Sequence, residues 1–255
     1  MSDKPLLYVI LGAAGSGRRA IVADLFSEEI AEAKDFAVLL SDREAEDAAE
    51  EKLGEITGWS WEGEGTIAGT VPPGTKTAVF VTDGRLSPVD QIEALKPWMA
   101  TQGLELGRIL VVVNCKLAFD NPGMAAWYDA CIHFADAVLL NHRDGVPNKW
   151  ISEFQEKFAK LYYPALFEFV KDGHLKNPAL LLSPVPRRMT HYFEEDQDWI
   201  VINDEGEEED EDEIEEDGDE EVEMVVVEDP YFVKRLNGRR EKEVPDVTRF
   251  LDKRD

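Results

Sequence analysis

A glycine-rich turn between an apolar run and a helical pattern constrains this chain more than any other part of its sequence. Residues 8–26 are YVILGAAGSGRRAIVADLF, so that Gly12, Gly15, Ser16 and Gly17 follow the apolar run. Their spacing is that of G-x-x-x-x-G-K-(S/T), a loop whose backbone N–H groups surround a phosphate at a helix N-terminus. The last two positions, normally a lysine and the hydroxyl residue that ligates Mg²⁺, are Arg18 and Arg19. The sequence therefore predicts a phosphate cradle that lacks its magnesium ligand.

Apolar runs alternate with helical patterns through the first 170 residues. Continuous Val/Ile/Leu runs are typical of strands that are covered on both faces, and their alternation with helices predicts a mainly parallel sheet. We expect an α/β, three-layer P-loop NTPase-like fold with helices on both faces, followed by an acidic disordered segment and a C-terminal tail. The expected strands are Leu6–Leu11, Phe36–Leu40, Ala78–Thr82, Ile109–Val113 and Ala137–Asn141, and the expected helices are Arg19–Lys34, Pro88–Met99, Met124–Phe134 and Lys149–Val170.

Negative charge is concentrated in one segment. The net charge is −27, but residues 204–223 carry 16 acidic and no basic side chains, so the other 235 residues hold 38 acidic and 27 basic groups and a charge of −11. Such a run cannot fold alone, and an acidic chain is a poor partner for nucleic acid. We predict a domain at 1–203, an acidic low-complexity linker at 204–223 and a tail at 224–255. A protein partner bound through the linker or the tail is expected.

The tail leaves two interpretations open. The segment DPYFVKRLNGRR places Tyr231 and Phe232 beside a basic cluster, which is typical of a short recognition element. Alternatively the tail docks on its own domain, since Met224–Val227 is apolar enough to pair with a sheet edge.

Cysteine content and hydropathy indicate in which cellular compartment the protein is expected. Cys115 and Cys131 are two isolated residues that offer neither a disulfide framework nor a cysteine-rich metal site. The first residues lack the layout of a signal peptide, and no apolar run reaches the roughly 18 residues of a membrane span. We expect a cytoplasmic protein without membrane association.

The motifs resemble those of the CobW/UreG/HypB-type metallochaperone GTPases, and most closely the CobW branch. GAAGSGRRA stands in place of GxxGxGK(S/T)T, and AVFVTDGRLSP resembles the third motif of that family through Gly84, Leu86 and Pro88, with Asp83 nearby. ADAVLLNHRDGV resembles the guanine motif Asn-Lys-x-Asp through Asn141 and Asp144, with His142 in place of lysine. Thr66, Ala68 and Gly69 stand where the family has three metal-binding cysteines.

This resemblance implies GTP or GDP as the nucleotide and no transition metal. The implied nucleotide-binding residues are Gly12, Gly15, Ser16, Gly17, Arg18, Arg19, Asp83, Asn141 and Asp144. Asp83 holds a water on Mg²⁺ in one interpretation and forms a salt bridge with Arg19 in the other. For the glycine loop and for Asn141 and Asp144 the alternative is an ordinary turn.

We predict a CobW-like nucleotide-binding-fold protein, a regulatory or interaction module with weak or no hydrolysis. No catalytic residue is assigned, because charge that develops on the transferred phosphate has no metal to stabilise it. Two alternatives stay open. One is a slow GTPase or metallochaperone-like GTP-binding protein in which Arg18 replaces the lysine. The other is a structural module that acts through its acidic segment and tail.

Overall fold

The computed structural model describes residues 4–32, 35–63, 65–194, 199–202, 208–209, 223–226 and 228–251. The chain divides into two compact units, Met1–Met189 with Glu243–Asp255, and Thr190–Lys242. Most of the acidic segment, and with it the prediction of a disordered linker, lies outside the described residues. The boundaries at 203 and 223 stay a prediction.

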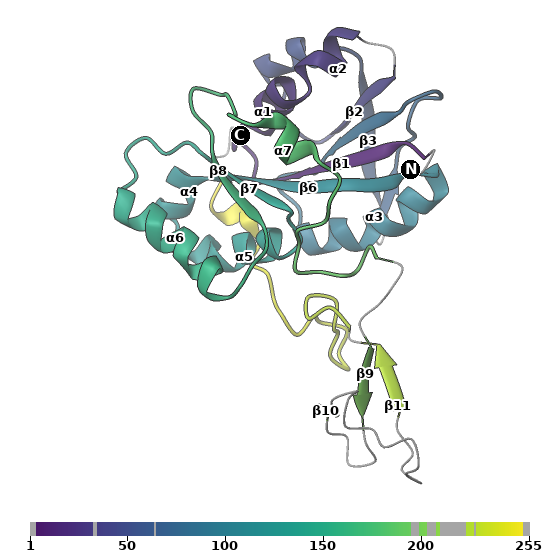
Figure 1. Cartoon of the computed structure of the whole chain (residues 1–255), viewed down its shortest axis with the longest axis vertical. Coiled ribbons are helices and arrows are strands. Elements are labelled where there is room, and N and C mark those ends of the chain that lie inside the picture. Colours follow the sequence, from purple (N-terminus) through teal and green to yellow (C-terminus); the bar gives the residue numbers. More distant parts are fainter. Residues whose placement is uncertain are drawn as a thin grey trace. The chain divides into compact units, whose positions relative to one another are not determined.

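An eight-stranded sheet forms the centre of the first unit (Figure 1). The strand order is β4-β3-β2-β5-β1-β6-β7-β8, and all neighbours are parallel except β3 and β4. The expected α/β fold is confirmed, with the first strand in the sheet interior between two parallel neighbours. The strands are β1 (Leu6–Leu11), β2 (Phe36–Ser41), β3 (Ile56–Glu62), β4 (Thr66–Ala68), β5 (Thr77–Val81), β6 (Glu105–Asn114), β7 (Ala137–Asn141) and β8 (Leu166–Phe169).

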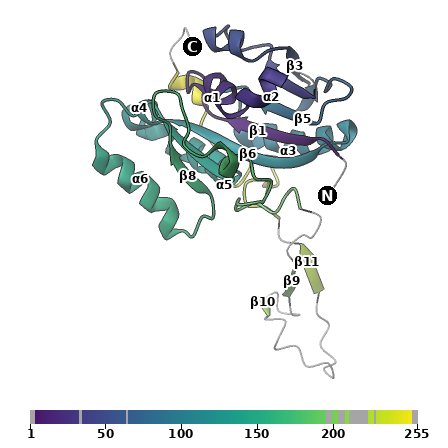
Figure 2. The same cartoon turned by 45° about the horizontal axis from the view of Figure 1, so that its top comes forward.

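Helices cover both faces of this sheet (Figure 2). On one face α1 and α7 bury Ile21, Val22 and Leu181 in a cluster with side chains of β1, β2, β5, β6 and β7. On the other face Trp98 of α3 packs against Phe80 of β5, with ring centroids 5.3 Å apart. The helices are α1 (Arg18–Leu25), α2 (Ser27–Glu32), α3 (Pro88–Gln102), α4 (Cys115–Asp120), α5 (Ala125–His133), α6 (Asn148–Lys160) and α7 (Pro178–Leu182), with 3₁₀ turns η1 (Ala48–Lys52), η2 (Pro122–Met124) and η4 (Val247–Arg249).

Two of the expected helices are wrong in their bounds, and two strands were not predicted. The helix expected over Arg19–Lys34 is two helices that break at Phe26, where the backbone has φ −112° and ψ 27°. The helix expected over Lys149–Val170 ends at Lys160, because Tyr162 is left-handed (φ 56°) and Pro164 disfavours helix in the residue before it. The residues beyond form β8. Strands β3 and β4 were not predicted, since β4 has only three residues and β3, with a single buried side chain, carries no continuous apolar run.

The second unit contains a small antiparallel sheet of order β10-β9-β11. Its strands are β9 (Trp199–Ile202), β10 (Glu208–Glu209) and β11 (Glu223–Val226). Within the same unit the rings of Tyr192 and Phe232 lie 4.5 Å apart. None of the helices among the described residues is long and apolar enough to cross a membrane.

Candidate functional site

The glycine loop joins the carboxyl end of β1 to the first turn of α1. Gly12, Gly15 and Gly17 have φ values of 149°, 71° and 86°, which residues with a Cβ rarely adopt. A Cβ on Gly12 would also lie 2.7 Å from the carbonyl oxygen of Val112 in β6. The glycine spacing therefore meets both a conformational and a packing requirement of this turn.

Asparagines at the ends of β6 and β7 hold the loop in place. The Nδ2 atom of Asn141 donates to the carbonyl of Ser16 at 2.9 Å, and that of Asn114 donates to the carbonyl of Gly15 at 3.3 Å. A Cβ on Gly17 would lie 2.7 Å from Asn141 Nδ2. Asn141 was predicted from its motif, whereas Asn114 was not, because it belongs to no pattern and is identified only by the strand order.

Several hydrogen-bond donors of the loop are unused. The backbone N–H groups of Gly15, Gly17, Arg18 and Arg19 donate to no acceptor in the described part of the chain. The Oγ atom of Ser16 is fully buried and has no hydrogen-bond partner among those residues. Donors that converge at the N-terminus of a helix favour an anion. The loop therefore has the chemistry of a phosphate cradle.

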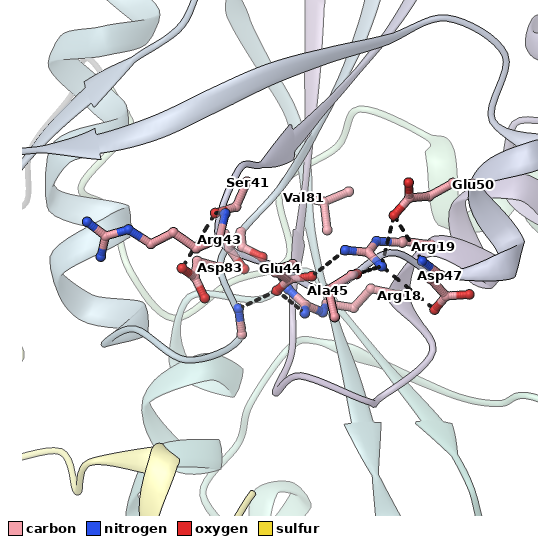
Figure 3. Close-up of polar contacts among 12 residues, drawn as sticks. Arg18, Arg19, Ser41, Arg43, Glu44, Ala45, Asp47, Glu50, Val81 and Asp83 are labelled. Carbon is pink, nitrogen blue, oxygen red and sulfur yellow. Dashed lines mark hydrogen bonds and ion pairs between the residues drawn. The ribbon is translucent and has the colours of Figure 1, made fainter. Parts of the chain in front are cut away.

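Both arginine side chains turn into a buried ion-pair network with Glu44 (Figure 3). Arg18 donates to the carbonyl of Thr82 and to Oε1 of Glu44. Arg19 donates to Oε2 of Glu44 at 3.1 Å, to the carbonyl of Ala45 at 2.7 Å, and pairs with Glu50 at 3.0 Å. The two arginines are only 4% and 7% exposed. The positions that normally supply an ammonium and a magnesium ligand are therefore neutralised within the chain.

Glu44 was missed by sequence reasoning and is the centre of this network. Its Oε1 also accepts the backbone N–H of Gly84 at 2.7 Å. Burial alone would raise the pKa of Glu44, but Arg18, the Gly84 N–H and Arg19 outweigh it, so the pKa is lowered. The carboxylate thus stays charged at neutral pH.

Asp83 is buried at the end of β5 and stabilises the turn that follows. Its Oδ1 accepts the backbone N–H of Arg85 at 2.8 Å, and its Oδ2 lies 3.5 Å from the hydroxyl of Ser41. Arg19 takes Glu44 and Glu50 as its carboxylate partners, so the interpretation in which Arg19 pairs with Asp83 is not what the structure contains. The role of Asp83 toward a magnesium-bound water stays a prediction.

A pocket of about 400 Å³ opens beside the loop. His142 and Asp144 line it from the turn after β7, and His142 is left-handed with φ 48°. Lys116, Leu117 and Asp120 of α4 also line it, together with Ala14 and Asn114. Asp144 therefore lines the same pocket as Ala14 of the loop. Lys116 was not predicted because it is contributed by a different strand end.

The residues around the loop do not fit a magnesium ion of the usual kind. Arg19 stands in the ligand position, and a guanidinium has donors but no lone pair for a cation. Thr66, Ala68 and Gly69 stand at the positions where the resembled family has metal-binding cysteines. Thr66 and Ala68 belong to β4, and the carbonyl of Gly69 accepts the indole N–H of Trp98 at 3.0 Å. Across the described ranges no three His, Cys, Asp or Glu side chains are grouped to hold a metal.

The glycine loop at the end of an interior parallel strand, with helices on both faces, defines an α/β protein of P-loop NTPase-like fold. Among solved structures, the chain is similar to Zn(II)-bound YjiA GTPase from E. coli, with 14% identity over 79% of this chain and 72% of that chain and a TM-score of 0.44. A Zn(II)-bound triple mutant of YjiA has a TM-score of 0.46 at the same identity and coverage.

The cell division protein FtsY from Thermotoga maritima is similar at 13% identity, over 71% of this chain and 68% of that chain, with a TM-score of 0.42. No family model matches the sequence, and no curated protein matches it. The fold class therefore rests on the topology of the chain itself.

Proposed function

We propose that this chain is a CobW-like, GTPase-fold protein that binds a guanine nucleotide and hydrolyses it weakly or not at all. The observation that carries the proposal is the ion-pair network in which Arg18 and Arg19 are bound by Glu44. It lies next to a loop in which four backbone N–H groups, those of Gly15, Gly17, Arg18 and Arg19, have no acceptor among the described residues. The loop retains the means to bind phosphate, and the groups that drive phosphoryl transfer are replaced.

Binding is supported by the loop and the pocket beside it. The unused N–H groups at the start of α1 and the buried hydroxyl of Ser16 suit a phosphate oxygen. Asp144 lines the adjoining 400 Å³ pocket, and its carboxylate suits the N1–H and amino group of guanine. A guanine nucleotide would thus contact both features in one pose.

Weak hydrolysis of the nucleotide is expected because the arginines of the loop are already paired within the chain. Phosphoryl transfer depends on a metal ion and on cations placed at the outer phosphates. Arg19 cannot ligate Mg²⁺, and the guanidinium of Arg18 is bonded to Glu44 and to the carbonyl of Thr82. We therefore assign no catalytic residue and propose a regulatory or interaction role, with a protein partner bound through the acidic segment or the C-terminal tail.

Isothermal titration calorimetry with GTP, GDP and ATP, each with and without Mg²⁺, tests the proposal. We expect guanine nucleotides to bind with one site per chain and ATP to bind more weakly. Asp144→Ala is expected to reduce the preference for guanine, whereas Glu156→Ala, at an exposed position of α6, should not. Absence of binding by every nucleotide would favour the structural module that acts through its acidic segment.

A further inference from the structure

The carboxylate of Glu44 is bound by the groups that would otherwise face the outer end of a phosphate chain. In loops of this spacing the residue at position 18 reaches the β- and γ-phosphates, and the residue at position 19 faces the metal that bridges them. Resting on the proposed function, we propose that the site selects a nucleoside diphosphate over a triphosphate, because Glu44 occupies the place of the third phosphate.

Three donors from two strand ends converge on this one carboxylate (Figure 3). Arg18 follows β1, Gly84 follows β5, and Arg19 lies one residue beyond Arg18 in α1. Arg18 and the Gly84 N–H share Oε1, while Arg19 takes Oε2 at 3.1 Å. Two guanidinium groups and a backbone N–H form an anion-binding site, and in this chain the anion that they bind is the carboxylate of Glu44.

The side chain of Glu44 is fixed in position by burial and by its hydrogen bonds. It is only 8% exposed, and its lowered pKa keeps it charged. Displacing it would leave a buried carboxylate without its partners, which is costly. A ligand phosphate therefore competes with a partner already in position.

The charges around this position disfavour a further phosphate. A pocket of about 160 Å³ next to the loop is lined by Glu44, Glu46 and Asp47, against Arg19 and Arg85. Arg19 is already paired with Glu44 and Glu50. A third phosphate would enter beside these carboxylates without an unpaired arginine of the loop to meet it.

A diphosphate has no such conflict. Its phosphates need the backbone N–H groups of Gly15, Gly17, Arg18 and Arg19, which have no acceptor among the described residues and lie on the loop itself. Its base has the pocket that Lys116 and Asp144 line. Neither feature involves the Glu44 network.

The test is calorimetry on the full-length wild-type chain with GDP and GTP, each with and without Mg²⁺. We expect GDP to bind at least about tenfold more tightly than GTP, and Mg²⁺ to leave that order unchanged. Equal or tighter binding of GTP would overturn the inference and leave the proposed function standing. Failure of both nucleotides to bind would overturn the two together.

A matched pair of variants tests whether Glu44 causes the selection. Glu44→Gln removes the charge but keeps the shape, so the GTP affinity should rise toward that of GDP. Glu51→Gln removes a charge from an exposed position of η1 and should leave the ratio at its wild-type value. An unchanged ratio in Glu44→Gln would overturn the inference, and if that variant does not fold, the wild-type preference decides alone.

Discussion

At the scale of single residues, the chemistry of this loop depends on the difference between lysine and arginine. A guanidinium is planar, permanently charged and able to donate to two partners at once. Arg18 uses this geometry to join the carbonyl of Thr82 to Glu44, which a lysine ammonium in its place would do less completely. The substitution thus turns a group that would bind ligand into one that binds the protein.

The first prediction concerns hydrolysis. Steady-state GTP turnover in the presence of Mg²⁺ should be absent or marginal, because Arg19 cannot coordinate the ion. Phosphate release measured against a no-protein control is the assay. Turnover typical of metal-dependent GTPases that is abolished by Arg18→Ala would contradict this expectation.

The second prediction concerns acid stability. Because the pKa of Glu44 is lowered in the folded chain, the unfolded chain takes up the proton first as the pH falls. The stabilisation by Glu44 is therefore complete above its unfolded pKa of about 4.3, and it is lost as the pH falls through the lower folded value. We expect Glu44→Gln to cost roughly 3 kcal/mol at pH 7 and less in acid.

Chemical denaturation of wild type and variant at a series of pH values measures this difference. Other carboxylates also titrate in this range, so the informative quantity is the gap between the two free energies of unfolding. A gap that stays constant from neutral pH to acid would show that Glu44 is not charged in the folded chain.

At the scale of elements, the site is made by turns at the carboxyl ends of neighbouring strands. The turn after β5 packs directly on the glycine loop, since the backbone N–H of Ala14 donates to the carbonyl of Gly84 at 3.1 Å. A Cβ on Gly84 would lie 2.2 Å from Ala14 N and 2.6 Å from Arg18 Nη2. The contact between the two turns therefore requires glycine at this position.

The third prediction follows from this contact. Gly84→Ala should destabilise the fold by roughly 3 kcal/mol, because the two turns have to separate, and should weaken nucleotide binding. Gly58→Ala in β3 is the matched control, since a Cβ there meets no atom within 4 Å and its φ is not left-handed. Thermal denaturation of both variants measures the difference, and equal melting temperatures would contradict the role of Gly84.

At the scale of the whole molecule, the chain leaves the first unit after Met189 and returns to it at Glu243. Val247 of the returning segment is buried, and the ring of Phe250 lies 3.0 Å from where a Cβ on Gly123 would be. Whether 228–242 also recognises a partner stays a prediction.

The fourth prediction concerns the metal content of the molecule. We expect no stoichiometric, tightly bound Zn²⁺, because the positions of the three thiolates are Thr66, Ala68 and Gly69. Equilibrium dialysis followed by elemental analysis measures it. One zinc per chain that persists after deletion of residues 204–223 would reveal a ligand set elsewhere.

The sequence by itself determined the five buried strands β1, β2, β5, β6 and β7 and the glycine turn. Apolar runs such as Leu6–Leu11 and Ala137–Asn141 have the structural bounds that the sequence predicted, because burial on both faces leaves a continuous local signal. The glycine spacing likewise reflects backbone conformations that Gly15 and Gly17 adopt within their own turn. Properties that depend on near neighbours in the chain can be predicted from the chain.

Only the tertiary structure decided what the arginines bind. Glu44 lies 26 residues from Arg18 in the sequence, and Gly84 lies 40 residues beyond Glu44. They meet because β2, β5 and β1 are consecutive in the sheet and their carboxyl ends lie at one edge. No local pattern encodes that strand order, since it results from packing of the whole sheet. The sequence around Glu44 likewise does not distinguish it from the other glutamates of the chain as the partner of the two arginines.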